Sequence, residues 1–209
     1  MKFTVSVAFL ACSAAGFCSI ATFDTYTEGF FATTLTDGGI TFYDADAYDP
    51  DGGPGMFDIE DASSLSDPSF SSPNTLNFGG YSAGPGYGGG RIGSFFMTNG
   101  HVETSASMDL YATANGNTAT LEAYLEGNLV GSASVVLTGA FSRLNHYTLG
   151  ITGVSFDTLK FVGSGADQNG AVFTMVDNVR IGAVPEPASF AALAVGAGVL
   201  LRRRRVARR

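Results

Sequence analysis

Carboxylates are the side chains of this sequence whose spacing could perform chemistry. Four aspartates fall within eight residues and precede a Gly-Gly pair: Asp44, Asp46, Asp49 and Asp51. Calcium prefers carboxylate oxygens that are held close together in a turning loop. The spacing is not that of an EF-hand, because Tyr48 stands at a ligand position and no glutamate stands at the twelfth. The cluster therefore predicts either a calcium site or an acidic loop in water.

A second group of carboxylates depends on the pairing of two predicted strands. Apolar residues alternate with polar ones from Val102 to Ala112 and again from Ala119 to Glu126, which is the period of a half-buried strand. Between them, Asn115-Gly116 favours a type I′ turn. Folding the strands about this turn gives a hairpin with one wholly apolar side. A three-residue turn, Glu126-Gly127-Asn128, is expected to lead into a further strand, Leu129–Leu137.

This hairpin places Asp109 directly opposite Glu122 on its outer face, with Tyr111 and Tyr124 beside them. Like charges that face each other across a strand pair are unfavourable unless they are solvated or bridged. The two carboxylates are therefore expected to be solvated, to hold a cation, or to form a sugar-binding face on which the tyrosines are platforms.

Asp177 lies in the last predicted strand, Val172–Ile181. In an alternating strand it shares its phase with four apolar residues, Phe173, Met175, Val179 and Ile181. The aspartate is therefore expected to point inward. A buried carboxylate needs a cation, backbone donors or a β-bulge that turns it outward, so both calcium at Asp177 and local hydrogen bonding are open.

Catalytic residues are not indicated. The two histidines, His101 and His146, lie outside any metal-ligand pattern, and no Gly-x-Ser-x-Gly elbow is present. A glycosidase needs two carboxylates at a defined separation, and no pair among the acidic residues stands out. We therefore predict that the protein is not an enzyme and has no catalytic residue.

The elements that must position these residues are strands. No stretch between Thr22 and Ala183 sustains an amphipathic helical period, whereas Gly, Ser, Thr, Phe and Tyr are abundant. Residues 22–183 are therefore predicted to form one all-β domain, a β-sandwich of the jelly-roll type. The other expected strands are Ile40–Tyr43, Met56–Ile59, Thr75–Phe78, Arg91–Met97, Asn145–Leu149 and Phe156–Val162, and Gly84–Gly90 is expected to be a surface loop.

The predicted domain is strongly acidic and free of cysteine. Eighteen acidic residues stand against four basic ones, which gives a net charge of −14. Nucleic acid and anionic membrane surfaces are therefore not expected as partners, whereas solubility outside the cell or divalent cations suit this charge. Cys12 and Cys18 both precede the domain, so neither a disulfide nor a cysteine nucleophile is expected within it.

The N-terminus has the pattern of a secretory signal peptide. Lys2 provides a positive charge, Phe3–Ala15 is uncharged and apolar, and Ser19-Ile20-Ala21 offers small residues for cleavage. Residues 1–21 are therefore predicted to be removed, so that the mature chain starts near Thr22. The alternatives are a first core strand, or a lipoprotein cut at Cys12, where the preceding residues form a poor lipobox.

The C-terminal residues 184–209 have three parts. Pro185 and Pro187 keep the chain extended around Glu186. Ala188–Leu201 carries no charge and would span about 21 Å as a helix, against about 30 Å for a bilayer core. Six arginines follow and would stop translocation; the first four are Arg202, Arg203, Arg204 and Arg205. The apolar run is therefore predicted to be a transmembrane helix, and the alternative is a buried core helix with a basic end.

Taken in this order, Val184-Pro185-Glu186-Pro187, the apolar helix and the arginine cluster resemble the PEP-CTERM sorting signal of bacterial surface proteins. The resemblance implies recognition and cleavage near the Pro-Glu-Pro motif by an exosortase, a membrane-embedded cysteine transpeptidase-like enzyme. It also implies export from bacteria that make extracellular polysaccharide or biofilm matrix. The tail would be a substrate, so none of its residues would be catalytic.

A shorter resemblance concerns Val176-Asp177-Asn178-Val179, which is similar to the closing strand of jelly-roll, carbohydrate-binding-module-like domains. In such domains an acidic residue at this place helps to hold a structural calcium. The resemblance therefore implies the same role for Asp177.

Together these patterns predict a non-enzymatic surface or matrix protein that binds polysaccharide. It would be exported, held in the inner membrane by its C-terminal helix until exosortase cleavage, and then placed at the cell surface or in the extracellular matrix. Two alternatives stay open: a secreted glycan-active hydrolase with a β-sandwich fold, and a surface protein whose membrane anchor is never cut.

Overall fold

The computed structural model describes residues 18–46, 55–61, 73–80, 93–113, 118–138, 145–164 and 173–182. Within these ranges there is no helix of the length and apolarity that spanning a membrane requires. The described elements are strands, in chain order β1 (Ser19–Ala21), β2 (Phe31–Ala32), β3 (Leu35–Asp37), β4 (Ile40–Asp46), β5 (Gly55–Asp61), β6 (Asn74–Gly80), β7 (Ser94–Thr98), β8 (Glu103–Thr113), β9 (Thr118–Leu125), β10 (Asn128–Val136), β11 (Asn145–Phe156), β12 (Thr158–Ser164) and β13 (Phe173–Ile181). The predicted sorting helix, the leader up to Phe17, the Asn115-Gly116 turn and the Gly84–Gly90 loop lie outside the described residues.

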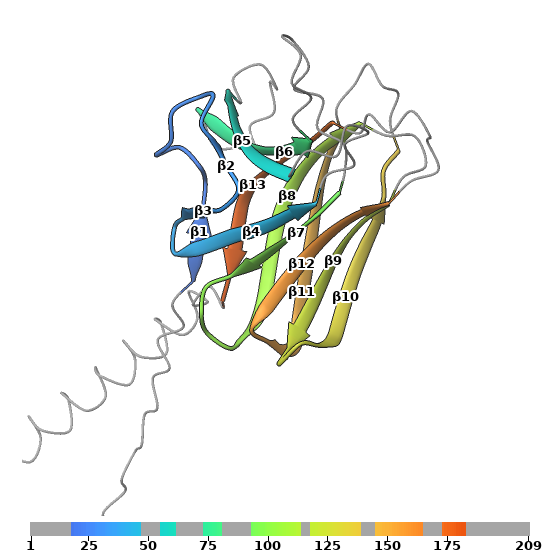
Figure 1. Ribbon diagram of the computed structural model, residues 1–209. Helices are drawn as coiled ribbons and strands as arrows, with labels where there is room; N and C mark the ends of the chain where they lie inside the picture. Colours follow the sequence, from blue (N-terminus) through green and yellow to red (C-terminus); the bar gives the residue numbers. More distant parts are fainter. Residues whose placement is uncertain are drawn as a thin grey trace, which may run out of the picture. The chain divides into compact units, whose positions relative to one another are not determined.

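The strands form two antiparallel sheets that pack face to face as a β-sandwich (Figure 1). Sheet A has the order β11-β8-β13-β6-β5-β2, with β1 also paired to β13, and sheet B has the order β10-β9-β12-β7-β4-β3. From β6 to β13 the chain passes back and forth between the sheets as two interleaved sets of four strands, which is a jelly-roll arrangement. The predicted all-β sandwich is therefore confirmed.

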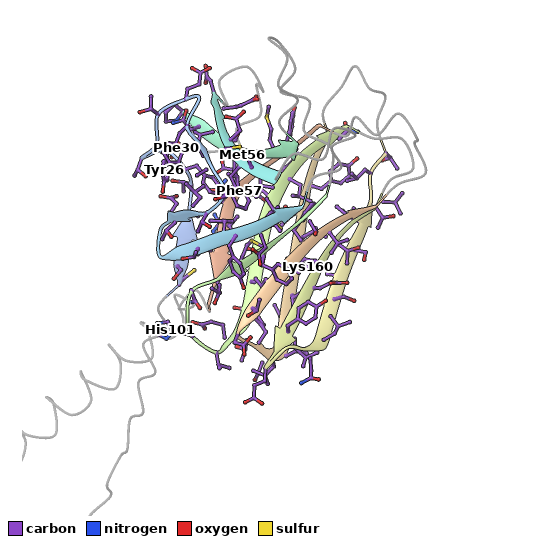
Figure 2. The ribbon with its side chains drawn as sticks, in the orientation of Figure 1. Tyr26, Phe30, Met56, Phe57, His101 and Lys160 are labelled. Atoms are coloured by element: carbon purple, nitrogen blue, oxygen red, sulfur yellow. The ribbon has the colours of Figure 1, made fainter. Side chains whose placement is uncertain are left out.

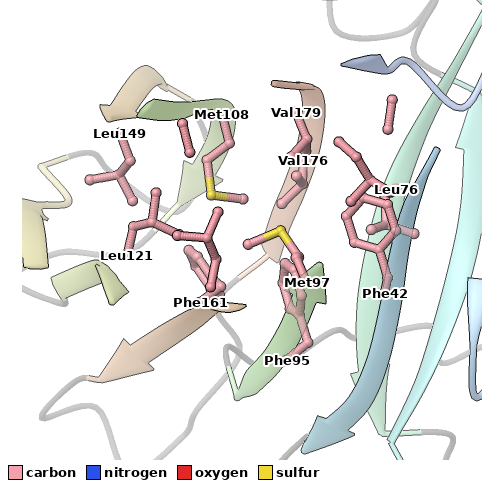
Figure 3. Packing of buried hydrophobic residues seen from close by; sticks show 14 of the residues in the cluster. Phe42, Leu76, Phe95, Met97, Met108, Leu121, Leu149, Phe161, Val176 and Val179 are labelled. Carbon is pink, nitrogen blue, oxygen red and sulfur yellow. The ribbon is translucent and has the colours of Figure 1, made fainter. Parts of the chain in front are cut away.

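The core lies between the sheets and receives alternate residues from their strands (Figure 3). Aromatic rings connect the two layers: Phe57 of sheet A lies 5.7 Å from Phe95 of sheet B, and Phe95 lies 5.2 Å from Phe161, measured between ring centroids. All three side chains are at most 1 % exposed. Full burial of such a side chain stabilises the fold by about 1.5–3 kcal/mol, so this cluster is a main source of the domain's stability.

The hairpin predicted between Val102–Ala112 and Ala119–Glu126 does not form. β8 pairs with β11 and β13 in sheet A, whereas β9 pairs with β10 and β12 in sheet B. The alternation itself is right, because Met108 of β8 and Leu121 of β9 are buried in the core (Figure 3). Leu110 of β8 is buried as well. Their apolar sides face each other through the core from opposite sheets. Alternation identifies the apolar side of a strand but not the strand beside it.

β9 and β10 do form a hairpin, but its turn has two residues instead of three. Glu126 and Gly127 have positive φ angles of 50° and 77°, as a type I′ turn requires. A β-bulge at Val130 then shifts the register of β10. The shift packs Val135 against the core and leaves Leu129 55 % exposed. The bulge thus turns Val135 toward the core, which the three-residue turn was expected to do.

Candidate functional site

The outer face of sheet B carries a row of side chains that crosses five strands. In the strand order β4, β7, β12, β9 and β10 its members are Tyr43, Phe96, Lys160, Glu122 and Ser132, each in register with the next. We call this set the sheet B row. Its members alternate along their strands with buried residues such as Phe42, Met97 and Leu159, so they face away from the core. The row therefore presents two rings, a cation and an anion on one face.

Contacts within the sheet B row hold its rings and its cation in place. The rings of Tyr43 and Phe96 are stacked, with centroids 5.6 Å apart and planes 20° apart. Lys160 Nζ lies 5.1 Å from the centroid of the Phe96 ring, which is a cation–π distance. Among the described residues no carboxylate forms an ion pair with Lys160. Its ammonium group, on the outward side of β12 (Figure 2), is therefore available to a ligand.

Glu122 is held by a neighbour on its own strand. The hydroxyl of Tyr124 donates a hydrogen bond of 2.6 Å to Oε2 of Glu122. This bond raises the pKa of Tyr124, and desolvation raises the pKa of Tyr43. Both phenols therefore stay protonated at neutral pH, and the face combines aromatic surface with donors and acceptors.

The other two residues of the predicted ligand face lie on sheet A instead of sheet B. Asp109 and Tyr111 are on the outer face of sheet A, because β8 belongs to that sheet. Asp109 Oδ1 accepts a hydrogen bond of 2.9 Å from Thr148 Oγ1 and lies 3.3 Å from Nε2 of His146. The predicted opposition of Asp109 and Glu122 is therefore wrong: the two carboxylates lie on opposite faces of the sandwich.

Asp177 is 0 % exposed, yet its strand does not have the predicted phase. A β-bulge at Asn178, which has a φ of 49°, shifts β13 so that Val176 joins Val179 in the core. Asp177 is instead in register with Asp109, on the outer face of sheet A. Its Oδ1 accepts the backbone N–H of Asn178 at 2.7 Å. A buried Asp177 was expected to need a cation, backbone donors or a β-bulge. The structure shows a bulge and a backbone donor.

The predicted calcium sites stay predictions. Asp44 is exposed and has a φ of 50°, and Asp46 ends β4. Asp49 and Asp51 lie outside the described residues. In the part of the chain that the structure describes, no group of three or more His, Cys, Asp or Glu side chains is arranged to hold a metal ion.

A further acidic group lies on the outer face of sheet A, where the sequence indicated no site. Oδ1 of Asp58 on β5 is buried without a hydrogen-bond partner. Burial raises the pKa of Asp58 to about 7, and the charges of Glu60 and Glu28 add to the increase. On the neighbouring strand Thr75 pairs in register with Glu60, and its hydroxyl is also buried without a partner. The ionised Asp58 carboxylate therefore carries an electrostatic cost in this part of sheet A at neutral pH.

Sequence reasoning did not identify Phe96 and Lys160 as site residues. Alternation within Phe156–Val162 separates Lys160 from the apolar Leu159 and Phe161, and this was the signal available for Lys160. Phe96 stands between two further apolar residues, so alternation does not mark it. Their meeting depends on β7 and β12 being neighbours in sheet B. That pairing joins strands far apart in the chain, so no local pattern contains it.

Comparison with known proteins adds information about the tail. Residues 183–205 match the PEP-CTERM protein-sorting motif. The chain carries a PEP-CTERM sorting signal. The match includes Val184-Pro185-Glu186-Pro187, the apolar run and Arg202–Arg205, as the sequence indicated. A PEP-CTERM signal marks an exported protein whose C-terminal membrane anchor is cleaved by an exosortase.

No curated protein matches the chain in sequence. Among solved structures, the K2 cleaved adhesin domain of Lys-gingipain is similar over 81 % of this chain and 98 % of that one, with 13 % identity and a TM-score of 0.48. A family 29 carbohydrate-binding module aligns over 80 % and 91 %, with 11 % identity and a TM-score of 0.37. A Stig cyclase from Fischerella sp. TAU aligns over 80 % and 98 %, with 12 % identity and a TM-score of 0.46. Because each TM-score is below 0.5, the fold of this chain rests on its own strand pairing.

Proposed function

We propose that this PEP-CTERM protein is a non-enzymatic, polysaccharide-binding protein of the cell surface or extracellular matrix. Its sorting signal supports export and exosortase processing. Its sheet B row supports binding of sugar. The observation that carries the proposal is the stacked Tyr43–Phe96 pair beside the Lys160 ammonium, which forms no ion pair among the described residues.

The chemistry of the sheet B row matches the two sides of a sugar ring. A pyranose presents apolar C–H groups on its face and hydroxyl groups around its rim. Aromatic side chains offer large apolar contact areas, and Tyr43 and Phe96 would meet the C–H groups. Lys160 donates hydrogen bonds and Glu122 accepts them, so both kinds of hydroxyl contact are available. Hydrogen bonds to charged groups contribute about 1.5–3 kcal/mol.

The dimensions of the row favour a chain of sugars over a single one. Neighbouring strands lie about 4.8 Å apart, so the distance from β4 to β10 is about 19 Å. A surface of that length accommodates several consecutive sugar rings. We therefore propose an oligosaccharide segment of a polymer as the ligand.

Binding fits the row better than hydrolysis does. Cleavage of a glycosidic bond requires a pair of carboxyl groups, one on each side of the bond. Glu122 is the one carboxylate within the sheet B row, and the Tyr124 hydroxyl bonds to it. The row therefore supplies contacts but not an acid–base pair.

Co-sedimentation tests the binding proposal. The mature protein is mixed with insoluble polysaccharide from the biofilm matrix of the producing bacterium, with and without a chelator. We expect Phe96→Ala and Lys160→Ala to lose most of the retention, and Phe30→Ala, which removes a 42 % exposed ring outside the row, to retain it. Unchanged urea unfolding of each variant shows that it is folded.

Two results would contradict the proposal in different ways. Equal retention of wild type and all three variants would remove the sheet B row from binding. Release of reducing ends during incubation would favour the glycan-active hydrolase. Intact mass of the mature protein tests the processing step: an end near Pro187 supports cleavage, and an end at Arg209 supports an uncleaved anchor.

A further inference from the structure

The short strand β1 is an integral part of sheet A. Ser19–Ala21 pairs in antiparallel register with Val179–Ile181 of β13. Ala21 is 0 % exposed, and both Val179 and Ile181 are buried. From its other side β8 pairs with the same end of β13. With β1 in place, this end of β13 therefore has a neighbour on both sides.

The turn between β3 and β4 is shaped around β1. Gly38 has a φ of +53°, and a Cβ at this position would lie 1.6 Å from the carbonyl oxygen of Ile20. At Gly39 a Cβ would lie 3.4 Å from Ser19 Oγ. Glycine is the residue that allows both the positive φ and the close backbone approach. The turn is therefore matched to a chain that contains Ser19 and Ile20.

The residues that follow β1 are held by Asp37 at the end of β3. Its Oδ2 accepts hydrogen bonds from the backbone N–H groups of Thr22 at 2.9 Å and Phe23 at 2.8 Å, and its Oδ1 accepts one from Thr25 Oγ1 at 3.1 Å. Phe23 is fully buried, with its ring centroid 5.3 Å from that of Phe42. β1 thus continues directly into a segment that belongs to the core.

We propose that the leader is cleaved on the N-terminal side of Ser19, so that β1 remains in the mature domain. Cleavage after Ala21, the site expected from the sequence, would leave the end of β13 as an open sheet edge with unpaired backbone groups. A cut after Ala15 instead follows a small-x-small pattern, because Ser13 and Ala15 stand third and first before the cut. This pattern comes after the apolar run that starts at Phe3. The inference rests on the proposed export of the protein.

Cys18 distinguishes the two cleavage sites. It immediately precedes β1, so a mature chain that keeps β1 after a cut at Ala15 contains one thiol. A mature chain that begins at Thr22 contains none, because Cys12 and Cys18 are the only cysteines of the sequence. The thiol is partly buried, so it should be labelled after denaturation.

The experiment measures the N-terminus and the thiol content of the exported full chain in the producing bacterium. Intact mass and N-terminal sequencing are combined with maleimide labelling under denaturing conditions. The double variant Ala15→Leu, Gly16→Leu removes the small residue directly before a cut after Ala15 or after Gly16, and Ala8→Leu makes the same chemical change within the apolar run as a control. We expect wild type and Ala8→Leu to begin before Ser19 with one thiol. The double variant should lose the end at Gly16, and it should either accumulate as precursor or begin at another residue before Ser19, again with Cys18 retained.

A mature N-terminus at Thr22 without a thiol, in wild type and in the double variant, would overturn the inference. The new α-amino group of Thr22 would then face the Asp37 carboxylate. An exported wild-type protein that still begins at Met1 would refute leader cleavage itself, and with it this inference. Neither result bears on polysaccharide retention, so failure of the cleavage site and failure of the proposed binding are distinguishable.

Discussion

Asp58 should make the stability of the domain fall as the pH rises from about 4 to about 7. Its carboxyl has a buried, unpartnered oxygen and lies near Glu60 and Glu28, and its pKa is raised to about 7. In the unfolded chain an aspartate has a pKa of about 3.9. Between these values the folded protein binds the proton more strongly, so the protonated form favours folding. The stabilising contribution is complete below about pH 4 and is lost as the pH rises through about 7.

The magnitude follows from the size of the pKa increase. About three pKa units correspond to about 4 kcal/mol at 1.36 kcal/mol per unit. Asp58 is only half-buried, so solvent screening reduces the expected effect to about 1–2 kcal/mol. Asp58→Asn supplies an uncharged amide that can donate a hydrogen bond to Glu60 at every pH, as the protonated carboxyl does. The variant should therefore be more stable than wild type by about 1–2 kcal/mol above pH 7 and have no advantage near pH 4.

Urea unfolding at a series of pH values measures this difference. The chain has no tryptophan, so the transition is followed by circular dichroism or tyrosine fluorescence. Asp157→Asn is the control of opposite sign, because the backbone N–H of Glu126, 2.9 Å from Asp157 Oδ2, lowers the pKa of that carboxyl. The wild-type protein should therefore gain stability relative to Asp157→Asn as the pH rises. A stability difference for Asp58→Asn that is constant from about pH 4 to pH 8 would refute the reasoning.

Two further pairs of substitutions test the packing. Gly38→Ala should destabilise the domain by more than about 2 kcal/mol, because a positive φ costs an L-residue about 1–2 kcal/mol and the new Cβ would also overlap the Ile20 backbone. Gly100 has a φ of +77° and open space around it. In the same urea titration Gly100→Ala should therefore show only the cost of the positive φ. Phe161→Ala should cost about 3–5 kcal/mol by removing a fully buried ring, whereas Val162→Ala on the outer side of β12 should cost far less. Equal losses within either pair of variants would show that the assumed contacts do not determine stability.

The strands themselves were largely predictable because their period is local. The alternation from Val102 to Ala112 correctly places Met108 and Leu110 in the core. Strand partners were not predictable in the same way. An alternating strand has the same appearance whether its successor turns back beside it or crosses to the opposite sheet, and Asn115-Gly116 favoured the first outcome. In the structure the chain instead crosses from β8 in sheet A to β9 in sheet B.

The candidate site shows the same division between local and distant information. Glu122 and Tyr124 were expected on one outer face because they alternate with buried residues of a single strand, and the structure places both there. Their expected companions were wrong because they came from the unformed hairpin. The actual neighbours, Phe96 and Lys160, arrive from β7 and β12 through register alone.

The pairing of β1 with β13 also connects the two ends of the domain. Ser19 is in register with Ile181, and the sorting motif match begins at residue 183. The leader and the sorting signal therefore join the domain at neighbouring positions of sheet A, so the domain can complete this strand pair while both segments are still attached. The sheet B row lies on the other sheet, beyond the core. Because the sheet B row and these two attachment points belong to different sheets, mutations in the row should disrupt the proposed binding, and mutations in the leader or the sorting motif should disrupt processing, independently of each other.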